Sequence, residues 1–168
     1  MCCSVKIIEL NELISVEKMN FRKKKHQDFL RILEQDKLVG GEDGYLKSLL
    51  FEIKDEIKEN IYDICGTSYI VYSNFLAVGY LYISNPYGID AYVTVSYAIL
   101  EKYRGLGYAK ALLSMIDILL SSDVATIKLV IDNSNVASKN LAVCSGYVEN
   151  TDINTKSNYK VYQKRKIS

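Results

Sequence analysis

The segment Tyr103–Ala109, with the sequence YRGLGYA, contains the residue types best suited to chemistry. Gly105 and Gly107 would let a ligand approach the backbone without meeting a Cβ atom, and they stand where a predicted strand ends and a predicted helix begins. The first turn of a helix carries unpaired N–H groups and a partial positive charge. The segment could therefore hold a phosphate or a diphosphate, but two glycines at a tight turn also suit a purely structural connection.

Two common phosphate-binding motifs do not fit this segment. No GKS or GKT follows the glycines, which excludes a P-loop. Lys110 stands where the GxGxxG motif of dinucleotide-binding folds would have its third glycine or alanine. A phosphate-binding site at this turn would therefore belong to neither of these two classes.

A second motif, NxxSxxLAxxxGY, lies one predicted strand further along the chain. It consists of Asn135, Ser138, Leu141, Ala142, Gly146 and Tyr147. Asn135 and the polar residues before it can cap the start of a helix, and Gly146 suits the left-handed conformation that often ends one. The two motifs therefore stand at the starts of two successive helices that are separated by one strand.

Taken together, the two motifs resemble the core motifs of the GNAT superfamily of N-acetyltransferases. Arg104, Gly107 and Ala109 match the R/QxxGxG/A loop of that family, and Asn135–Tyr147 matches its NxxA/SxxLYxxxGF/Y segment. The run YAILEKYRGLGYA and the serine in the second motif are most similar to the branch that contains the ribosomal-protein N-terminal acetyltransferases. The resemblance extends over about Phe75–Tyr147, and the first half of the chain shows no match.

The resemblance implies an N-acetyltransferase that transfers an acetyl group from acetyl-CoA to a primary amine of a small molecule or a protein N-terminus by direct attack. Acetyl-CoA would be a co-substrate, bound where the strands Tyr92–Leu100 and Thr126–Ile131 move apart and leave backbone groups for the pantetheine arm. The implied cofactor-binding residues are Ile99, Leu100, Arg104, Gly105, Leu106, Gly107, Tyr108, Ala109, Asn135 and Ser138.

The match leaves the general base and the general acid unassigned. Thr94 aligns with the glutamate that many relatives place in the strand before the loop, and Ala142 aligns with the tyrosine that often protonates the departing thiolate. Asp90 and Glu101 only flank the strand, so the candidate catalytic residues are Thr94 and Ser96, acting through a bound water, and the alternative base is the solvent. A non-catalytic acyl-CoA-binding regulatory module is the alternative function, and a purely structural interaction domain is a third.

Helical periodicity is typical of the first part of the chain, from about residue 11 to residue 60. Leu30 and Leu33 belong to one apolar stripe, and a second stripe runs over Leu46–Ile57. Glycines in Val39–Gly44 separate the two predicted helices. His26 follows a basic run, so we expect it on a hydrated helix face.

The second part of the chain has a pattern typical of strands and helices in alternation. We expect, in order, strands at Ser68–Tyr72 and Phe75–Ile83 with a tight turn at Ser73–Asn74, a strand at Tyr92–Leu100, a helix at Leu106–Leu120, a strand at Thr126–Ile131, a helix ending near Ser145, and a hairpin of Tyr147–Thr151 with Tyr159–Lys164. A strand, helix and strand in succession predict a parallel pair with a right-handed crossover.

The predicted fold class is therefore α/β, in the mixed α+β sense. With the resemblance, it becomes a GNAT fold, a central mixed and mostly antiparallel sheet that is splayed between two parallel strands and flanked by helices. We treat residues 1–168 as a single acetyltransferase domain. Within it, residues 11–60 would form a helical acceptor-side region, residues 66–151 the acetyl-CoA-binding core, and residues 152–168 a C-terminal hairpin strand.

Composition agrees with an ordinary globular protein and excludes several partners. Of 168 residues, 49% are hydrophobic and 24% charged, and the net charge is +1, so no global field favours nucleic acid or an anionic membrane. The longest apolar run, Ala111–Leu120, is too short to span a bilayer. Four cysteines without CxxC spacing and one histidine predict reduced thiols and no metal site. We expect a cytoplasmic protein that binds acetyl-CoA and an amine acceptor, with homodimerisation an open possibility.

Overall fold

A computed structural model describes residues 7–9, 13–40, 46–59, 65–152 and 158–167. The strands are β1 (Ile7–Glu9), β2 (Ser15–Lys18), β3 (Gly66–Ser73), β4 (Leu76–Ser84), β5 (Tyr92–Ile99), β6 (Thr126–Asp132), β7 (Val148–Glu149) and β8 (Tyr159–Arg165). The helices are α1 (Lys24–Gln35), α2 (Lys47–Lys58), α3 (Tyr108–Met115) and α4 (Val136–Cys144), with short 3₁₀ turns η1 (Glu101–Tyr103) and η2 (Ile116–Leu119).

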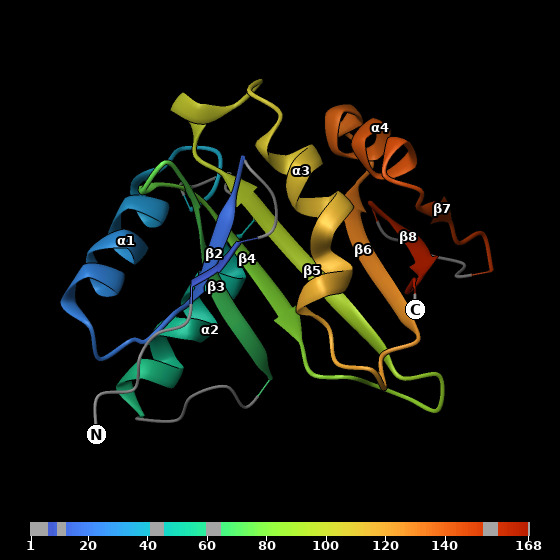
Figure 1. Cartoon of the computed structure of the whole chain (residues 1–168), viewed down its shortest axis with the longest axis horizontal. Coiled ribbons are helices and arrows are strands. Elements are labelled where there is room, and N and C mark those ends of the chain that lie inside the picture. The colour runs from blue at the N-terminus through green and yellow to red at the C-terminus, as the bar shows by residue number, and fades with distance from the viewer. Residues whose placement is uncertain (1–6, 10–12, 41–45, 60–64, 153–157, 168) are drawn as a thin grey trace.

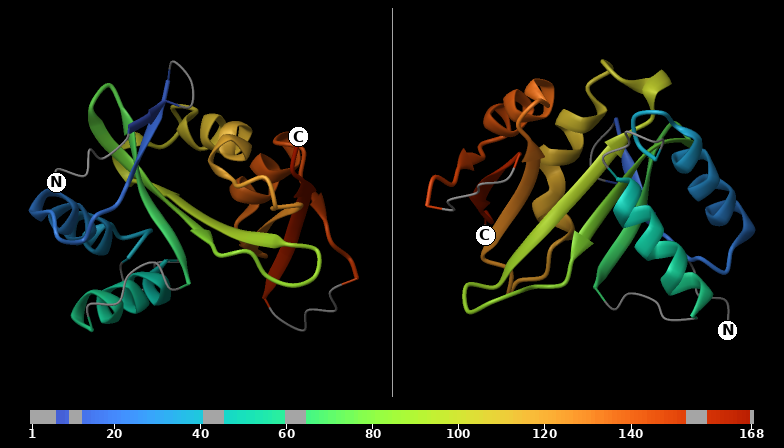
Figure 2. Two further views of the ribbon diagram at one scale, coloured as in Figure 1. Left: turned by 60° about the horizontal axis from the view of Figure 1, so that its bottom comes forward. Right: turned by 180° about the vertical axis from the view of Figure 1, so that it is seen from behind.

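The strands form one eight-stranded sheet in the order β1-β2-β3-β4-β5-β6-β8-β7. The successive pairs from β1–β2 to β4–β5 are antiparallel, β5 and β6 are parallel, and β8 pairs antiparallel with both β6 and β7. Helices α1 and α2 lie on one face of the sheet, and α3 lies on the other (Figures 1 and 2). The predicted mixed α+β architecture, with its parallel pair and closing hairpin, is confirmed.

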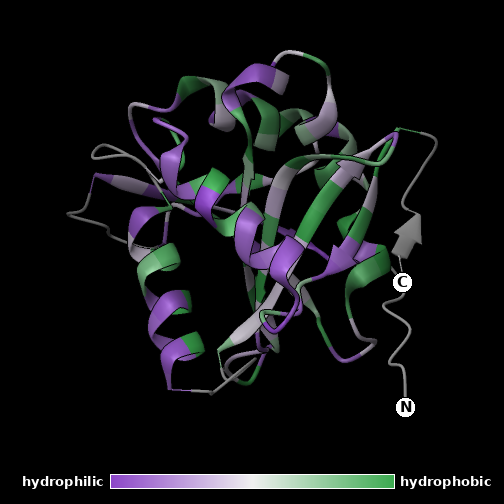
Figure 3. Cartoon of the chain, turned by 90° about the vertical axis from the view of Figure 1, so that its left-hand side faces the viewer, coloured by the Kyte–Doolittle hydropathy of each residue, from purple (hydrophilic) through white to green (hydrophobic). Residues whose placement is uncertain are grey.

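Each face of the sheet supports its own hydrophobic cluster. Leu33 of α1 and Tyr80 of β4 are fully buried in the cluster under α1 and α2, and Leu113 of α3 is fully buried in the cluster on the other face. Figure 3 shows the side of α1, where the helices carry hydrophilic and hydrophobic residues in turn. Burying one apolar stripe of each helix against the sheet is the main favourable contribution to folding.

The prediction of continuous helix from about residue 11 was wrong at β2. Residues Ser15–Lys18 form a strand that pairs with β3, with Ser15 opposite Tyr72 and Lys18 opposite Tyr69. Four residues are too few to show a period of two, and the backbone ladder to β3 outweighs local helix preference. The predicted helices α1 and α2 are confirmed, while Gly41 and Gly44 of the expected separator lie outside the described residues.

The prediction that His26 lies on a hydrated surface was also wrong. Its side chain is fully buried against β2. The Nδ1 atom accepts the backbone N–H of Asn20 at 2.7 Å, so Nε2 carries the proton and donates to Glu17 Oε1 at 3.2 Å. Glu17 is buried as well, and Lys25 Nζ donates to its other carboxylate oxygen at 3.1 Å. The unpredicted strand β2 is what covers this face of α1.

Smaller differences concern the ends of the second-half elements. The β3–β4 turn lies at Asn74 and Phe75, both with positive φ, one residue later than predicted. The helix expected up to Leu120 is α helix only to Met115 and continues as η2. The start and stop of α4 agree with the prediction, because Asn135 caps its first turn and Gly146 has a φ of +85°.

Candidate active site

Strands β5 and β6 separate soon after they begin. Their parallel pairing covers only Tyr92 with Thr126, Val93 with Ile127 and Thr94 with Lys128, although both strands continue well beyond. Figure 1 shows them diverging toward the loop before α3. Because β5 keeps its pairing with β4 as far as Ile99, only its edge toward β6 lacks a partner strand after Thr94. Backbone groups along that edge are available to a ligand.

The loop between β5 and α3 has the geometry of an anion cradle. Gly105 and Gly107 have φ values of +76° and +84°, and a Cβ atom at either would meet nothing within 4 Å. Gly107 precedes the first residue of α3, Tyr108, and provides no side-chain cap, so the first N–H groups of the helix remain available. Arg104 Nε donates to the carbonyl of Ile99 at 2.9 Å and ties the loop to the end of β5.

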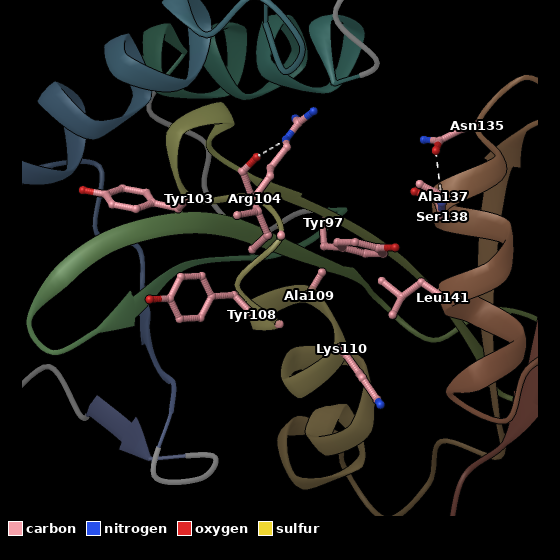
Figure 4. Close-up of a pocket in the computed structure, with 13 residues that line it drawn as sticks. Tyr97, Tyr103, Arg104, Tyr108, Ala109, Lys110, Asn135, Ala137, Ser138 and Leu141 are labelled. Carbon is pink, nitrogen blue, oxygen red and sulfur yellow. Dashed lines mark hydrogen bonds between the residues drawn. The ribbon is translucent and has the colours of Figure 1, made fainter.

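A cavity of about 360 Å³ lies between β5, this loop, α3 and α4 (Figure 4). Its lining residues are Tyr97, Ile99, Tyr103, Arg104, Gly105, Gly107, Tyr108, Ala109, Lys110, Asn135, Ala137, Ser138 and Leu141. All of the predicted cofactor-binding residues line it except Leu100 and Leu106. Leu100 is buried and its N–H donates to Val78, whereas Leu106 is exposed. Two segments far apart in the sequence, the loop and the start of α4, therefore face one space.

The start of α4 forms the wall opposite β5. Asn135 Oδ1 accepts the N–H of Ser138 at 3.0 Å, which fixes the first turn of the helix. The ring of Tyr97 points from β5 toward α4 (Figure 4). Burial raises the pKa of Tyr97, and the nearby Ser138 side chain opposes this shift. Tyr97 and Ser138 both line the cavity, on opposite sides of the gap between the strands.

A second, smaller cavity of about 110 Å³ opens from the same gap. Its lining residues are Leu46, Val95, Ser96, Tyr97, Leu129, Val130, Ile131, Asp132, Asn135, Ser138 and Tyr159. It shares Tyr97, Asn135 and Ser138 with the larger cavity, so the two spaces meet at these side chains. Leu46, at the start of α2, belongs to the hydrophobic cluster of the α1 and α2 face, so this opening lies beside that cluster.

Of the residues considered for proton transfer, only some line these cavities. Ser96 lines the smaller cavity, but Thr94 lines neither, and its N–H donates to Ser84 Oγ at 2.8 Å. Ala142 is buried in the hydrophobic core. Among the residues that line the two cavities, Asp132 has the only carboxylate.

Sequence reasoning did not select Tyr97 or Asp132 for the site. A signal existed for Tyr97, because the period of two along the strand places it on the same face as the buried residues Val93, Val95 and Ile99. No comparable signal existed for Asp132, since its position depends on how far β6 diverges from β5.

Within the described part of the chain, no group of three His, Cys, Asp or Glu side chains could hold a metal ion. None of the described helices has the length and the apolar character of a membrane span.

Comparison with known proteins adds two findings. Residues 27–147 match the model of the acetyltransferase (GNAT) family. A search of curated proteins by sequence finds no match.

Solved structures with a similar fold cover nearly the whole chain. A mutant of spermidine N-acetyltransferase SpeG from Vibrio cholerae has a TM-score of 0.70 at 13% identity, with 93% of this chain and 95% of that chain covered. An acetyltransferase from Salmonella typhimurium that modifies the N-terminal serine of a ribosomal subunit protein has a TM-score of 0.69 at 12% identity, with 97% and 100% covered. RimJ from Mycobacterium smegmatis, in complex with a CoA disulfide, has 0.64 at 13%, with 96% and 86% covered. At these identities the likeness is one of fold.

Proposed function

The chain belongs to the acetyltransferase (GNAT) family, and from this premise we propose that the larger cavity binds acetyl-CoA and the smaller one admits the amine acceptor. The observation that carries this proposal is the meeting of the two cavities at Tyr97, Asn135 and Ser138. A donor and an acceptor that enter from the two sides would meet there without crossing the sheet. Direct transfer requires this arrangement, because the reacting atoms must approach to about 3–3.5 Å.

The residues of the larger cavity fit acetyl-CoA at both of its recognisable parts. The N–H groups of Gly105–Ala109 and the start of α3 offer donors and a partial positive charge for the diphosphate. The edge of β5 after Thr94 offers alternating N–H and carbonyl groups for the amides of the pantetheine arm. Ile99 and Arg104 contribute to the wall between these two parts. Leu100 and Leu106 do not line the cavity, so any contact between them and the cofactor would be made by their backbone groups.

Acetyl transfer then needs few groups from the protein. The acceptor nitrogen, as a neutral amine, attacks the carbonyl carbon of the thioester, the carbon–sulfur bond breaks, and the proton lost by nitrogen passes to solvent. Ser96 can hold a water at the acceptor opening, whereas Thr94 is a weaker candidate because it lines neither cavity. Tyr97 keeps its proton at neutral pH, since burial raises its pKa, and can donate it to the departing thiolate; the phenolate that remains then regains a proton from solvent.

The acceptor is a primary amine, carried either by a small molecule or by a protein N-terminus. The similar folds include proteins that act on spermidine and on a ribosomal protein, which supports both classes. A non-catalytic acyl-CoA-binding module is not favoured, because a second cavity opens where the acyl group would lie. The free thiols of Cys65 and Cys144 suit a reducing compartment such as the cytoplasm, and Cys2 and Cys3 lie outside the described residues.

Thermal unfolding with acetyl-CoA tests this proposal, using two matched glycine variants. At about 100 times its Kd, the ligand adds about 2.7 kcal/mol of stability, which raises the Tm of a domain of this size by about 5–10 °C. Gly107→Glu places a carboxylate in the cradle and should abolish the shift. Gly146→Glu is the control, because its φ of +85° and open surroundings match those of Gly107, but it lies at the end of α4.

The same three proteins should then be assayed for release of the CoA thiol from acetyl-CoA in the presence of amines. Wild type and Gly146→Glu should release CoA thiol with at least one acceptor, and Gly107→Glu should not. A wild-type protein whose Tm is unchanged by acetyl-CoA would contradict the proposed function, as would equal shifts in the two variants.

A further inference from the structure

The smaller cavity contains a single charged side chain, the carboxylate of Asp132 at the end of β6. Its Oδ1 atom accepts hydrogen bonds from the backbone N–H and the hydroxyl of Ser134, at 2.7 and 2.5 Å. These bonds, aided by the charge of Lys139, lower the pKa of Asp132. Within the described residues Asp132 forms no ion pair, and Lys139 Nζ donates instead to the carbonyl of Asn133. The cavity therefore carries one negative charge at neutral pH.

An aromatic side chain stands beside this carboxylate. Tyr159 of β8 is the direct partner of Asp132 in the sheet, so both side chains project from the same face. Tyr159 also lines the cavity. A carboxylate next to an aromatic ring is a combination that binds organic ammonium groups, through charge and through the negative face of the ring.

The position of this pair is close to the junction of the cavities without being part of it. The N–H of Asn135 donates to the carbonyl of Asp132 at 3.0 Å, and Asn135 lines both cavities. A group held by Asp132 would therefore lie a few bonds from the nitrogen that attacks the thioester. The volume of about 110 Å³ admits only a slender chain, since one water molecule in the liquid takes about 30 Å³.

We propose that Asp132 and Tyr159 bind a second positively charged group of the acceptor, so that the protein selects amines with two ammonium groups. This inference rests on the proposed function and names the acceptor class for the same site. Asp132 is a specificity-determining residue in this role and takes no proton from the attacking nitrogen. An acceptor with a carboxylate at the same position would be repelled.

Three amines with the same four-carbon chain test the preference. They are diaminobutane, butylamine and γ-aminobutyrate, each titrated calorimetrically into the protein with and without saturating CoA. Diaminobutane should bind about fivefold more tightly than butylamine, because two opposite charges attract across a short distance at this half-exposed carboxylate, and γ-aminobutyrate should bind most weakly. Initial rates with acetyl-CoA should follow the same order in kcat/KM, with the KM for acetyl-CoA unchanged.

Two variants assign the preference to the pair. Asp132→Asn keeps an oxygen that can accept from Ser134, so it preserves the turn while removing the charge, and it should reduce the advantage of diaminobutane to less than about twofold. Tyr159→Leu should reduce it partly. Asp90→Asn is the control. Asp90 is an exposed carboxylate just before the start of β5, so this variant should behave as wild type.

The inference would be overturned by equal binding of the three amines to the wild type, by no detectable binding of diaminobutane, or by an unchanged preference in Asp132→Asn. Failure of the proposed function is a separate result, because it shows as no binding of acetyl-CoA. The titrations without CoA measure the charge preference in either case.

Discussion

The buried pair of Glu17 and His26 shows how single residues fix the first helix to the sheet. Burial lowers the pKa of His26, because the charged imidazolium would lose solvation and also the hydrogen bond from Asn20. Burial alone would raise the pKa of Glu17, but Lys25, His26 and Tyr72 outweigh it, so the pKa is lowered. Burial, together with this same carboxylate, raises the pKa of Tyr72 to about 12. Glu17 is thus a buried charge whose hydrogen bonds are satisfied.

These pKa directions predict a loss of stability in mild acid. His26 is the only histidine of the chain. In the unfolded chain it takes up a proton as the pH falls through about 6.5, while the folded protein resists protonation, so the free energy of unfolding should fall with decreasing pH below that value. The slope cannot exceed about 1.4 kcal/mol per pH unit for one proton. The contribution of Glu17 is lost only at lower pH, as it falls through the lowered pKa of that carboxyl.

Chemical denaturation between pH 7.5 and 5.5 measures this effect. These limits lie about one pH unit above and below the pKa of a histidine in an unfolded chain. His26→Gln retains a donor toward Glu17 but cannot titrate, so it should be less stable at the upper pH and show a flatter dependence. A variant with the wild-type slope would show that His26 is not the group responsible.

Strands and helices of the second half were predictable because each carries a pattern long enough to read. The alternation of Val93, Val95 and Ile99 predicted β5, and the capping residue Asn135 with Gly146 predicted α4. Strand β2 was not predicted because four residues show no period. Without this strand, His26 was wrongly predicted to lie on the surface. The separation of β5 and β6 came from family resemblance alone. The position of Asp132 beside Tyr159 could not be predicted, because it depends on pairing between strands far apart in the sequence.

The separated strands predict where ligand binding should protect the backbone. Amides of β5 between Val95 and Ile99 that face β6 have no partner strand, so they should exchange hydrogen quickly in the free protein. Acetyl-CoA should slow exchange in this segment and in the loop Gly105–Ala109. Peptides from β3, which is paired on both sides, serve as the control and should not change.

Hydrogen exchange followed by mass spectrometry gives this comparison in one experiment. Slowing that is spread evenly over all strands would indicate global stabilisation only. Protection limited to β6 or β8 would place the ligand elsewhere and contradict the assignment of β5.

The whole molecule is one sheet with a hydrophobic cluster on each face, and both clusters share the central strands. Leu33 lies in the cluster under α1 and α2, and Leu113 lies in the cluster under α3. Because β4 and β5 contribute to both, neither cluster can lose its packing without affecting the other. We therefore expect one cooperative unfolding transition.

Truncation of either leucine should lower the stability of that single transition. Leu33→Ala and Leu113→Ala each remove a fully buried side chain and should cost about 2–5 kcal/mol. Leu33→Ala should still gain stability from acetyl-CoA, since the cofactor cavity lies on the other face of the sheet. Calorimetry that resolved two separate transitions in either variant would contradict a single cooperative unit.

The most direct measurement for the central claim is a crystal structure of the protein with CoA bound. The diphosphate should contact the N–H groups of Gly105–Ala109, the pantetheine arm should pair with the edge of β5 after Thr94, and the sulfur should lie at the junction formed by Tyr97 and Ser138. CoA bound at any other surface, or a gap between β5 and β6 that stays closed to it, would contradict the claim.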